Sequence, residues 1–249
     1  MLPATYIAVL LLAFLSGLTT LIGVALALYF RKSIKGIVIG IGFSTGIMLL
    51  ISFFELIPES VGAAGIPRTL IAVLSGICLI GILNFIIPHT HFIEEKGHID
   101  IHLLKTAYLV AFGLILHDFP EGFAMANSYI HSPSLGLLVA LAIAIHNIPE
   151  EFAMAVPIIQ TEKKKLLFKI AFLSGLAEPA GAVLGLIAVS FLPGLNPFFM
   201  AFAAGAMIFV SIHELLPMAR RYKRIFLFVL GIILSIVVYM GLSVVLIPE

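Results

Sequence analysis

Charged side chains are scarce in this chain, and cysteine is almost absent. Only 11% of its 249 residues are Asp, Glu, Lys or Arg, 61% are hydrophobic, and the mean hydropathy is +1.20. Soluble domains are roughly half apolar and about a quarter charged, so this composition excludes a soluble fold and predicts an integral membrane protein. The net charge of +1 argues against a nucleic-acid partner, because phosphate binding needs an excess of Lys and Arg. The single cysteine, Cys78, excludes an intramolecular disulfide framework.

Long hydrophobic runs fill nearly the whole sequence. Eight of them are long enough to cross a bilayer as helices, and they cover residues 4–30, 36–58, 68–87, 105–130, 134–159, 167–191, 197–218 and 224–247. The runs are continuously apolar, whereas the strands of a transmembrane barrel alternate in polarity. The first run has neither a basic n-region nor a small-residue cleavage site, so we expect a retained span. The sequence therefore predicts an all-α integral membrane protein of the cell membrane, with eight transmembrane helices in a single domain covering residues 1–249.

The basic residues are distributed unevenly between the two sets of connectors. Of the 14 Lys and Arg residues, 13 lie between spans 1–2, 3–4, 5–6 and 7–8, and only Arg68 lies on the opposite side. Because basic connectors stay in the cytoplasm, this asymmetry predicts an even number of spans with both termini extracytoplasmic. The connector of residues 88–104 holds four of the eight histidines: His89, His91, His98 and His102. We expect a His-rich cytoplasmic loop there, either binding released metal or simply solvated.

Several predicted helices share sequence motifs in pairs. The run AFLSG of residues 13–17 recurs at 171–175, and ELIP at 55–58 aligns with ELLP at 214–217. HDFPEGFAMA at 117–126 likewise matches HNIPEEFAMA at 146–155. Each pair joins an odd-numbered span to an even-numbered one, so the partners cross the membrane in opposite directions. The matches indicate inverted repeats, helices 1–2 with 6–7 and helix 4 with 5, which in transporters place the substrate site near the bilayer midplane.

Ionisable residues lie in the middle of three predicted spans, where an intramembrane charge is by default a functional hypothesis. They are His117, Asp118 and Glu121 on helix 4, His146, Asn147, Glu150 and Glu151 on helix 5, and Glu178 on helix 6. His117 and Glu121 are four residues apart, as are His146 and Glu150, so each pair shares one helix face. Two antiparallel helices facing each other would bring these imidazoles and carboxylates together. Asp118 and Asn147 lie about 100° around their helices, where Glu151 and Glu178 are placed to join them in a second site.

Imidazole and carboxylate ligands suit zinc, iron(II), manganese or cobalt, and they suit sodium or potassium poorly. Pro120 and Pro149 lie inside the same motifs, and we expect each to break its helix and free a carbonyl, at Leu116 and Ile145, as an extra oxygen ligand. A set of structural ion pairs is the alternative. It fails because five acids lie at this depth without a Lys or Arg beside them. A metal ion, or protons, must neutralise these carboxylates.

Further polar residues lie toward the ends of helices 2 and 7. In the predicted topology Glu55 and Glu59 face an outer vestibule, and His213 and Glu214 face an inner one. Acidic residues at both mouths would concentrate cations on either side of the central site. A carboxylate that merely reaches the interface at a helix end is the alternative, and it is strongest for Glu59.

These residues favour transport of zinc or a similar divalent cation into the cytoplasm, with the metal as substrate and no resident cofactor. An intramembrane metal-dependent hydrolase is the second hypothesis, since a carboxylate beside a metal-bound water can act as general base. An enzyme, however, has no need of two interconvertible halves. A proton-coupled carrier of organic substrates is a third hypothesis, disfavoured because no Lys or Arg lies at membrane depth to bind an anion. Iron, manganese, cobalt and cadmium accept the same ligands as zinc.

The motifs HDFPEG, HNIPEE, AEPAG, ELIPES and HELLP resemble those of the ZIP (Zrt/Irt-like) divalent-metal transporters, in their short prokaryotic-type branch. The resemblance covers essentially the whole chain. It implies eight helices, both termini outside, a homodimer, and metal entry through a binuclear centre between helices 4, 5 and 6. It also implies an elevator-like movement of helices 1, 4, 5 and 6 against the others.

By this resemblance, the first metal site would consist of His117, Glu121, His146 and Glu150. The second would consist of Asp118, Asn147 and Glu178, with Glu121 and Glu150 placed to bridge the two. Two positions depart from the family pattern: Asp118 stands where the motif often has Asn, and Glu151 stands where it commonly has Gly. The extra carboxylate of Glu151 either strengthens the second site or holds a proton.

Overall fold

The computed structural model describes residues 3–30, 33–86, 117–159 and 164–246. Within these ranges the chain is helical and contains no β-strand. Seven helical stretches are long and apolar enough to cross a membrane, which confirms an all-α membrane protein. The predicted His-rich loop of residues 88–104 lies outside the described residues, as does the first part of the predicted span 105–130.

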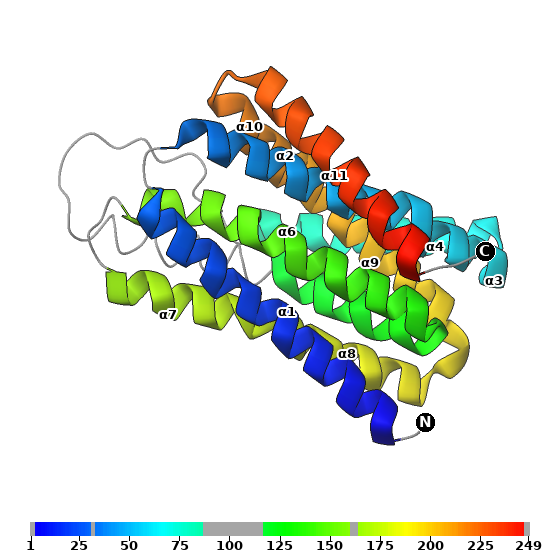
Figure 1. Cartoon of the computed structure of the whole chain (residues 1–249). Helices are drawn as coiled ribbons and strands as arrows, with labels where there is room; N and C mark the ends of the chain where they lie inside the picture. Colours follow the sequence, from blue (N-terminus) through cyan, green and yellow to red (C-terminus); the bar gives the residue numbers. More distant parts are fainter. Residues whose placement is uncertain (1–2, 31–32, 87–116, 160–163, 247–249) are drawn as a thin grey trace.

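The helices pack side by side in one bundle (Figure 1). In chain order they are α1 (Pro3–Tyr29), α2 (Ile34–Leu50), η1 (Ile51–Leu56), α3 (Ile57–Ala64), α4 (Ile66–Ile86), the helix of residues 117–131, α6 (Pro133–Ile159), α7 (Lys164–Gly175), α8 (Ala177–Phe191), η2 (Pro193–Leu195), α9 (Asn196–Val210), η3 (Ser211–Leu215), α10 (Leu216–Arg221) and α11 (Ile225–Leu246). The second, sixth and seventh predicted spans are thus each built from more than one helical segment.

The segments η1 and η3 are π-helices inserted into the second and seventh predicted spans. The backbone N–H of Ile57 bonds to the carbonyl of Ser52, and that of Leu216 bonds to the carbonyl of Ser211, five residues back in each case. Each π segment ends two residues before a proline, Pro58 or Pro217. A proline inside a helix removes a hydrogen bond and crowds the preceding turn, and a π turn is one way to absorb that disruption. The two segments fall at aligned positions of the sequence repeat.

The prediction that Pro149 breaks its helix is wrong. Helix α6 continues from Pro133 to Ile159 through this proline, and the helix of residues 117–131 contains Pro120 without interruption. Prolines are tolerated within membrane helices when neighbouring elements support the backbone, and α2 packs directly against Pro149 at Gly40. The break falls instead at Leu176, between α7 and α8, which leaves Glu178 in the first turn of α8.

Close helix pairs in the bundle depend on glycine. A Cβ atom added to Gly122 would lie 1.9 Å from the backbone oxygen of Glu178, so the helix of residues 117–131 touches α8 backbone to backbone. A Cβ atom added to Gly42 of α2 would lie 2.1 Å from the backbone oxygen of Phe228 in α11. Small residues are a general means of close helix packing in membranes. Here they fix α8 against the helix of residues 117–131, and α2 against α11.

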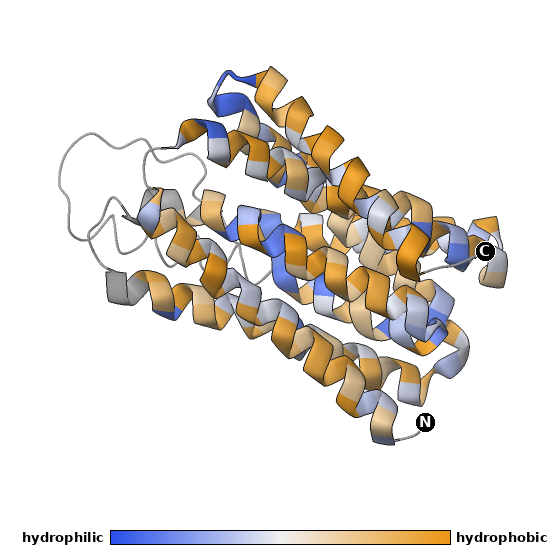
Figure 2. Cartoon of the chain, in the orientation of Figure 1, coloured by the Kyte–Doolittle hydropathy of each residue, from blue (hydrophilic) through white to orange (hydrophobic). Residues whose placement is uncertain are grey.

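The two ends of the bundle differ in charge. Helices α2 and α7 begin, and α10 meets α11, at the end opposite the two chain termini (Figure 1). These segments contain Lys35, Lys169, Arg220 and Lys223, whereas Arg68 stands near the start of α4 at the other end. Most residues of the helices are hydrophobic, and hydrophilic ones lie at the turn between α10 and α11 and in the middle of α6 (Figure 2). The uneven distribution of Lys and Arg between connectors therefore places most of the described basic residues at one end of the bundle.

Candidate metal centre

Three helices carry the eight predicted central ligands. The helix of residues 117–131 and α6 each contribute a His and a Glu four residues apart, and α8 contributes Glu178 from its first turn. All eight side chains are buried, with exposed fractions of 4% or less: His117, Asp118, Glu121, His146, Asn147, Glu150, Glu151 and Glu178. The helical spacing of four thus directs each His–Glu pair inward, as the sequence predicts.

The two His–Glu pairs meet across the interface between their helices. Nε2 of His117 lies 2.5 Å from Oε1 of Glu150 and 3.8 Å from Oε1 of Glu121. Nε2 of His146 lies 3.1 Å from Oε1 of Glu121 and 3.7 Å from Oε2 of Glu150. Each imidazole therefore contacts a carboxylate from the opposite helix as well as one from its own.

This cluster has the spacing of a metal site. One ligand atom from each of His117, Glu121 and Glu150 lies within 4.8 Å of the other two. The Nδ1 atom of His146 lies 3.0 Å from the carbonyl oxygen of Ala142, which leaves Nε2 directed at the carboxylates. A hydrogen bond from the second ring nitrogen to a backbone carbonyl is the usual way in which proteins orient a metal-binding histidine. The geometry is suited to a divalent cation with imidazole and carboxylate ligands.

A second polar group adjoins the first. Asn147 Nδ2 donates a hydrogen bond to Oε1 of Glu178 at 2.6 Å. The hydroxyl of Ser174, on α7, donates to Oδ2 of Asp118. Asp118 follows His117 directly in the chain, and Asn147 follows His146, so the second group borders the first. The structure thus brings Asp118, Asn147 and Glu178 to the side of the first cluster.

Glu151 occupies a different place from the other seven residues. Its side chain is buried, and a Cβ atom added to Gly23 of α1 would lie 2.8 Å from the Cβ of Glu151. The residue therefore lies where α6 packs against α1, whereas the neighbouring Glu150 contacts both imidazoles. Among the described residues, Glu151 makes no hydrogen bond to the cluster.

Two carboxylate oxygens in the cluster lack a partner. Oε2 of Glu121 and Oε2 of Glu178 are buried without a hydrogen-bond donor among the described residues. A buried carboxylate oxygen that accepts no hydrogen bond is costly, unless a cation or a proton satisfies it. Both atoms therefore mark the positions where a bound cation would be stabilising.

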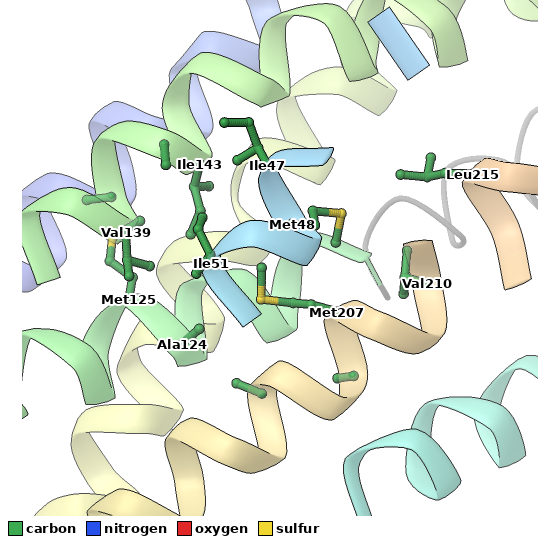
Figure 3. Close-up of a cluster of buried hydrophobic side chains, with 14 of the residues drawn as sticks. Ile47, Met48, Ile51, Ala124, Met125, Val139, Ile143, Met207, Val210 and Leu215 are labelled. Carbon is green, nitrogen blue, oxygen red and sulfur yellow. The ribbon is translucent and has the colours of Figure 1, made fainter. Parts of the chain in front are cut away.

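A group of buried apolar side chains, called the apolar layer below, includes residues about one helical turn from the cluster (Figure 3). Its side chains come from α2, η1, the helix of residues 117–131, α6 and α9, and all are at most 1% exposed: Ile47, Met48, Ile51, Ala124, Met125, Val139, Ile143 and Met207. Met125 follows Glu121 by one turn, and Ile143 precedes His146 by about one turn on the antiparallel helix. These two residues of the layer therefore lie on the side of the cluster that faces His131, at the end of the helix of residues 117–131.

The four residues predicted along the pathway lie outside the central cluster. Glu55 accepts a hydrogen bond from the hydroxyl of Tyr239 on α11, and Glu214 accepts one from Asn84 of α4 at 3.4 Å. Both glutamates are buried and belong to the π segments η1 and η3. His213 is exposed at the surface of the chain and stacks on Phe209.

Glu59, the fourth of these residues, contacts His131, which lies outside the predicted sites. Oε2 of Glu59 lies 3.0 Å from Nε2 of His131, and both side chains are partly exposed. Ser44 of α2 was also missed: its hydroxyl donates a hydrogen bond to Oε2 of Glu150. Both residues reach their partners through tertiary contacts, so no local sequence signal points to them.

Comparison with known proteins places the chain in a family. A family model described as ZIP zinc transporter matches residues 88–247. Proteins named zinc transporter ZupT are similar over nearly their full length. The one from Chlorobium luteolum is 38% identical, over 96% of this chain and 97% of that protein, and the one from Clostridium perfringens is 34% identical, over 92% of each. One from Streptococcus mutans is 35% identical, over 90% of this chain and 91% of that protein. The resemblance seen in the motifs is confirmed, and the chain belongs to the ZIP zinc transporter family.

Proposed function

We propose that this chain carries zinc, or a similar divalent cation, across the cell membrane into the cytoplasm. Relatives named as zinc transporters support zinc as the substrate. Seven apolar helical stretches of spanning length support a multi-pass membrane protein. The observation that carries the proposal is the buried cluster of two imidazoles and two carboxylates, His117, Glu121, His146 and Glu150, between two membrane helices. The family match favours transport over the hydrolase alternative.

The proposed centre binds two metal ions. His117, Glu121, His146 and Glu150 provide the first site, and Asp118, Asn147 and Glu178 provide the second. The unpartnered Oε2 atoms of Glu121 and Glu178 support a cation between the two groups. Glu151 adds a carboxylate beside α1, which either strengthens the second site or holds a proton. Ligands of this kind also accept iron, manganese, cobalt and cadmium.

The proposed scaffold is a bundle of eight transmembrane helices built from inverted repeats, with both termini outside the cytoplasm. The aligned positions of the two π segments support the repeat of helices 1–2 in helices 6–7. Placement of both chain termini at one end of the bundle supports an even number of crossings (Figure 1). We further propose a homodimer, a single domain over residues 1–249, and a cytoplasmic metal-binding loop at residues 88–104.

The transport step is a relative movement of the helices that carry the ligands against the others. Acidic residues at the two mouths, Glu55 and Glu59 outside and Glu214 with His213 inside, concentrate the ion before and after this step. The apolar layer supports alternating access, because part of it lies between the cluster and one end of the bundle. A charged ion crosses such a layer only when the layer opens.

Reconstituted protein in sealed vesicles tests the proposal. Zinc is added outside and its accumulation is followed with an internal fluorescent indicator, for the natural chain, His146→Ala and Asn127→Ala. Asn127 is a buried amide whose Nδ2 bonds to the Phe123 carbonyl, outside the cluster, so it controls for loss of a buried polar group. We expect uptake by the natural chain and Asn127→Ala, and at least a tenfold loss in His146→Ala.

Equal uptake by His146→Ala and the natural chain would show that the cluster is not the transport site. Absence of uptake by the natural chain, with zinc-stimulated hydrolysis of a peptide or ester instead, would favour the metal-dependent hydrolase.

A further inference from the structure

Ser44 lies beside the proposed metal centre but belongs to a helix that carries none of the eight central ligands. It is on α2, its side chain is fully buried, and its hydroxyl donates a hydrogen bond to Oε2 of Glu150 on α6. The other oxygen of that carboxylate, Oε1, lies 2.5 Å from Nε2 of His117. The two oxygens of the Glu150 carboxylate therefore contact two different helices: one accepts from Ser44 of α2, and the other lies beside His117.

A glycine brings α2 close enough for this contact. A Cβ atom added to Gly40 would lie 2.9 Å from the backbone oxygen of Pro149, the residue before Glu150. Ser44 follows Gly40 by four residues, so both lie on the face of α2 that packs against α6. The close approach at Gly40 therefore places a short serine side chain, one turn later, within reach of the glutamate.

Helix α2 also packs closely against a second helix, α11. Cβ atoms added to Gly42 and Gly231 would lie 2.1 Å and 2.2 Å from backbone oxygens across the contact between α2 and α11. The hydroxyl is therefore presented by a closely packed pair of helices. A polar group held in this way is preorganised, and it can restrict a flexible carboxylate to one orientation without losing side-chain entropy of its own.

We propose that Ser44 is a positioning residue for the metal centre, which orients the Glu150 carboxylate so that Oε1 points to the metal position near His117. The inference rests on the proposed function of the cluster. It adds a contribution from α2 to a centre otherwise built from the helix of residues 117–131, α6 and α8. Glutamate has three side-chain torsions, so without the hydroxyl the carboxylate samples orientations that do not bind the ion.

The neighbouring residue Thr45 provides a matched control. Its side chain is also buried, but its hydroxyl donates to the carbonyl of Ile41 in the same helix, at 2.7 Å. Ser44→Ala and Thr45→Ala each remove one hydroxyl from adjacent positions of α2. Only the first removes a contact to a proposed ligand.

The test measures zinc uptake by vesicles that contain the natural chain, Ser44→Ala, Ser44→Cys, Thr45→Ala or His146→Ala. Hydrogen bonds to charged groups are strong enough that loss of one raises the zinc KM about tenfold or more in Ser44→Ala. The maximal rate should change less than about threefold, because no ligand is removed. Ser44→Cys keeps nearly the same size with a weaker donor, and we expect its KM to lie between those of the natural chain and Ser44→Ala. Thr45→Ala should keep the natural KM.

Zinc binding to purified protein completes the test, with Ser44→Ala measured in the natural background and in a Glu150→Gln background. If the serine acts through this carboxylate, its loss should reduce affinity about tenfold in the first background and less than about twofold in the second, because the two residues are coupled.

Three results would overturn the role of Ser44. They are a natural KM in Ser44→Ala, an equal rise of KM in Thr45→Ala, and an undiminished effect of Ser44→Ala in the Glu150→Gln background. A fully active His146→Ala is a separate outcome, because it would overturn the proposed function of the cluster itself.

Discussion

Replacing Gly122 by alanine should disable transport although it replaces none of the proposed ligands. A Cβ atom at this position would lie 1.9 Å from the backbone oxygen of Glu178, and real Cβ atoms essentially never come within 3.0 Å of a non-bonded heavy atom of another part of the chain. The helix of residues 117–131 and α8 must therefore separate by about 1 Å, the difference between these two distances. That separation moves Glu121 and Glu178 apart. It also strains or breaks the hydrogen bond of 2.6 Å between the Asn147 amide and Glu178.

The expected magnitude follows from this displacement. A misplacement of about 1 Å in a preorganised site costs on the order of a hundredfold in rate. Overpacking of this kind costs about 1–3 kcal/mol of stability, so the protein should still fold and melt at a lower temperature. Initial rates of zinc uptake, corrected for the amount of reconstituted protein, measure the first effect, and thermal unfolding of purified protein measures the second.

Two other glycines provide the controls for Gly122→Ala. Cβ atoms added to Gly62 of α3 and Gly241 of α11 would meet nothing within 4 Å. Gly62→Ala and Gly241→Ala should therefore transport like the natural chain. Uptake by Gly122→Ala within about twofold of the natural rate would refute the reasoning, because it would mean that the backbone contact between these helices does not set the geometry of the centre.

Two further predictions concern protons and metal binding. Zinc must displace protons from carboxylates and imidazoles, so uptake should slow as the external pH falls from 7 toward the ordinary carboxyl range near 4; a rate that stays constant over this interval argues against proton competition. Zinc at about a hundred times its Kd should stabilise the folded protein by about 2.7 kcal/mol. Thermal unfolding should show this stabilisation in the natural chain and not in Glu121→Gln, because Glu121 contacts both imidazoles; an equal shift in both proteins would place the bound zinc elsewhere.

The helices and the inward faces of the ligands could be predicted because both depend on local spacing. Apolar runs of about 20 residues predict spanning helices regardless of their partners. A separation of four residues puts His117 with Glu121, and His146 with Glu150, on one helix face. The two motifs also match each other, which suggests that their faces meet. The structure does bring these four side chains into contact.

The helix irregularities could not be predicted, because proline has several structural outcomes. Pro149 lies within a continuous α-helix, whereas Pro58 and Pro217 follow π segments. Each of these prolines has at least one acidic residue within three positions, so the local sequence does not distinguish them, and the packing of neighbouring helices decides between these outcomes. The contacts of Ser44 and His131 could not be predicted from the sequence for a related reason. Each depends on how closely two helices that are distant in the sequence approach each other, and for Ser44 that approach is possible because of Gly40.

The buried acids of the cluster need cations to balance their negative charge. Five acids are buried there, Asp118, Glu121, Glu150, Glu151 and Glu178, with two imidazoles as their basic neighbours. Lys and Arg of the described chain stand instead near the ends of helices, as Lys35, Arg68 and Arg220 do. Buried charges of one sign without counterions are strongly destabilising. If metal binds here as proposed, the centre exchanges one kind of cation for another, protons for metal, whenever an ion enters or leaves. This requirement disfavours a passive open pore and favours a site that opens to one side of the membrane at a time.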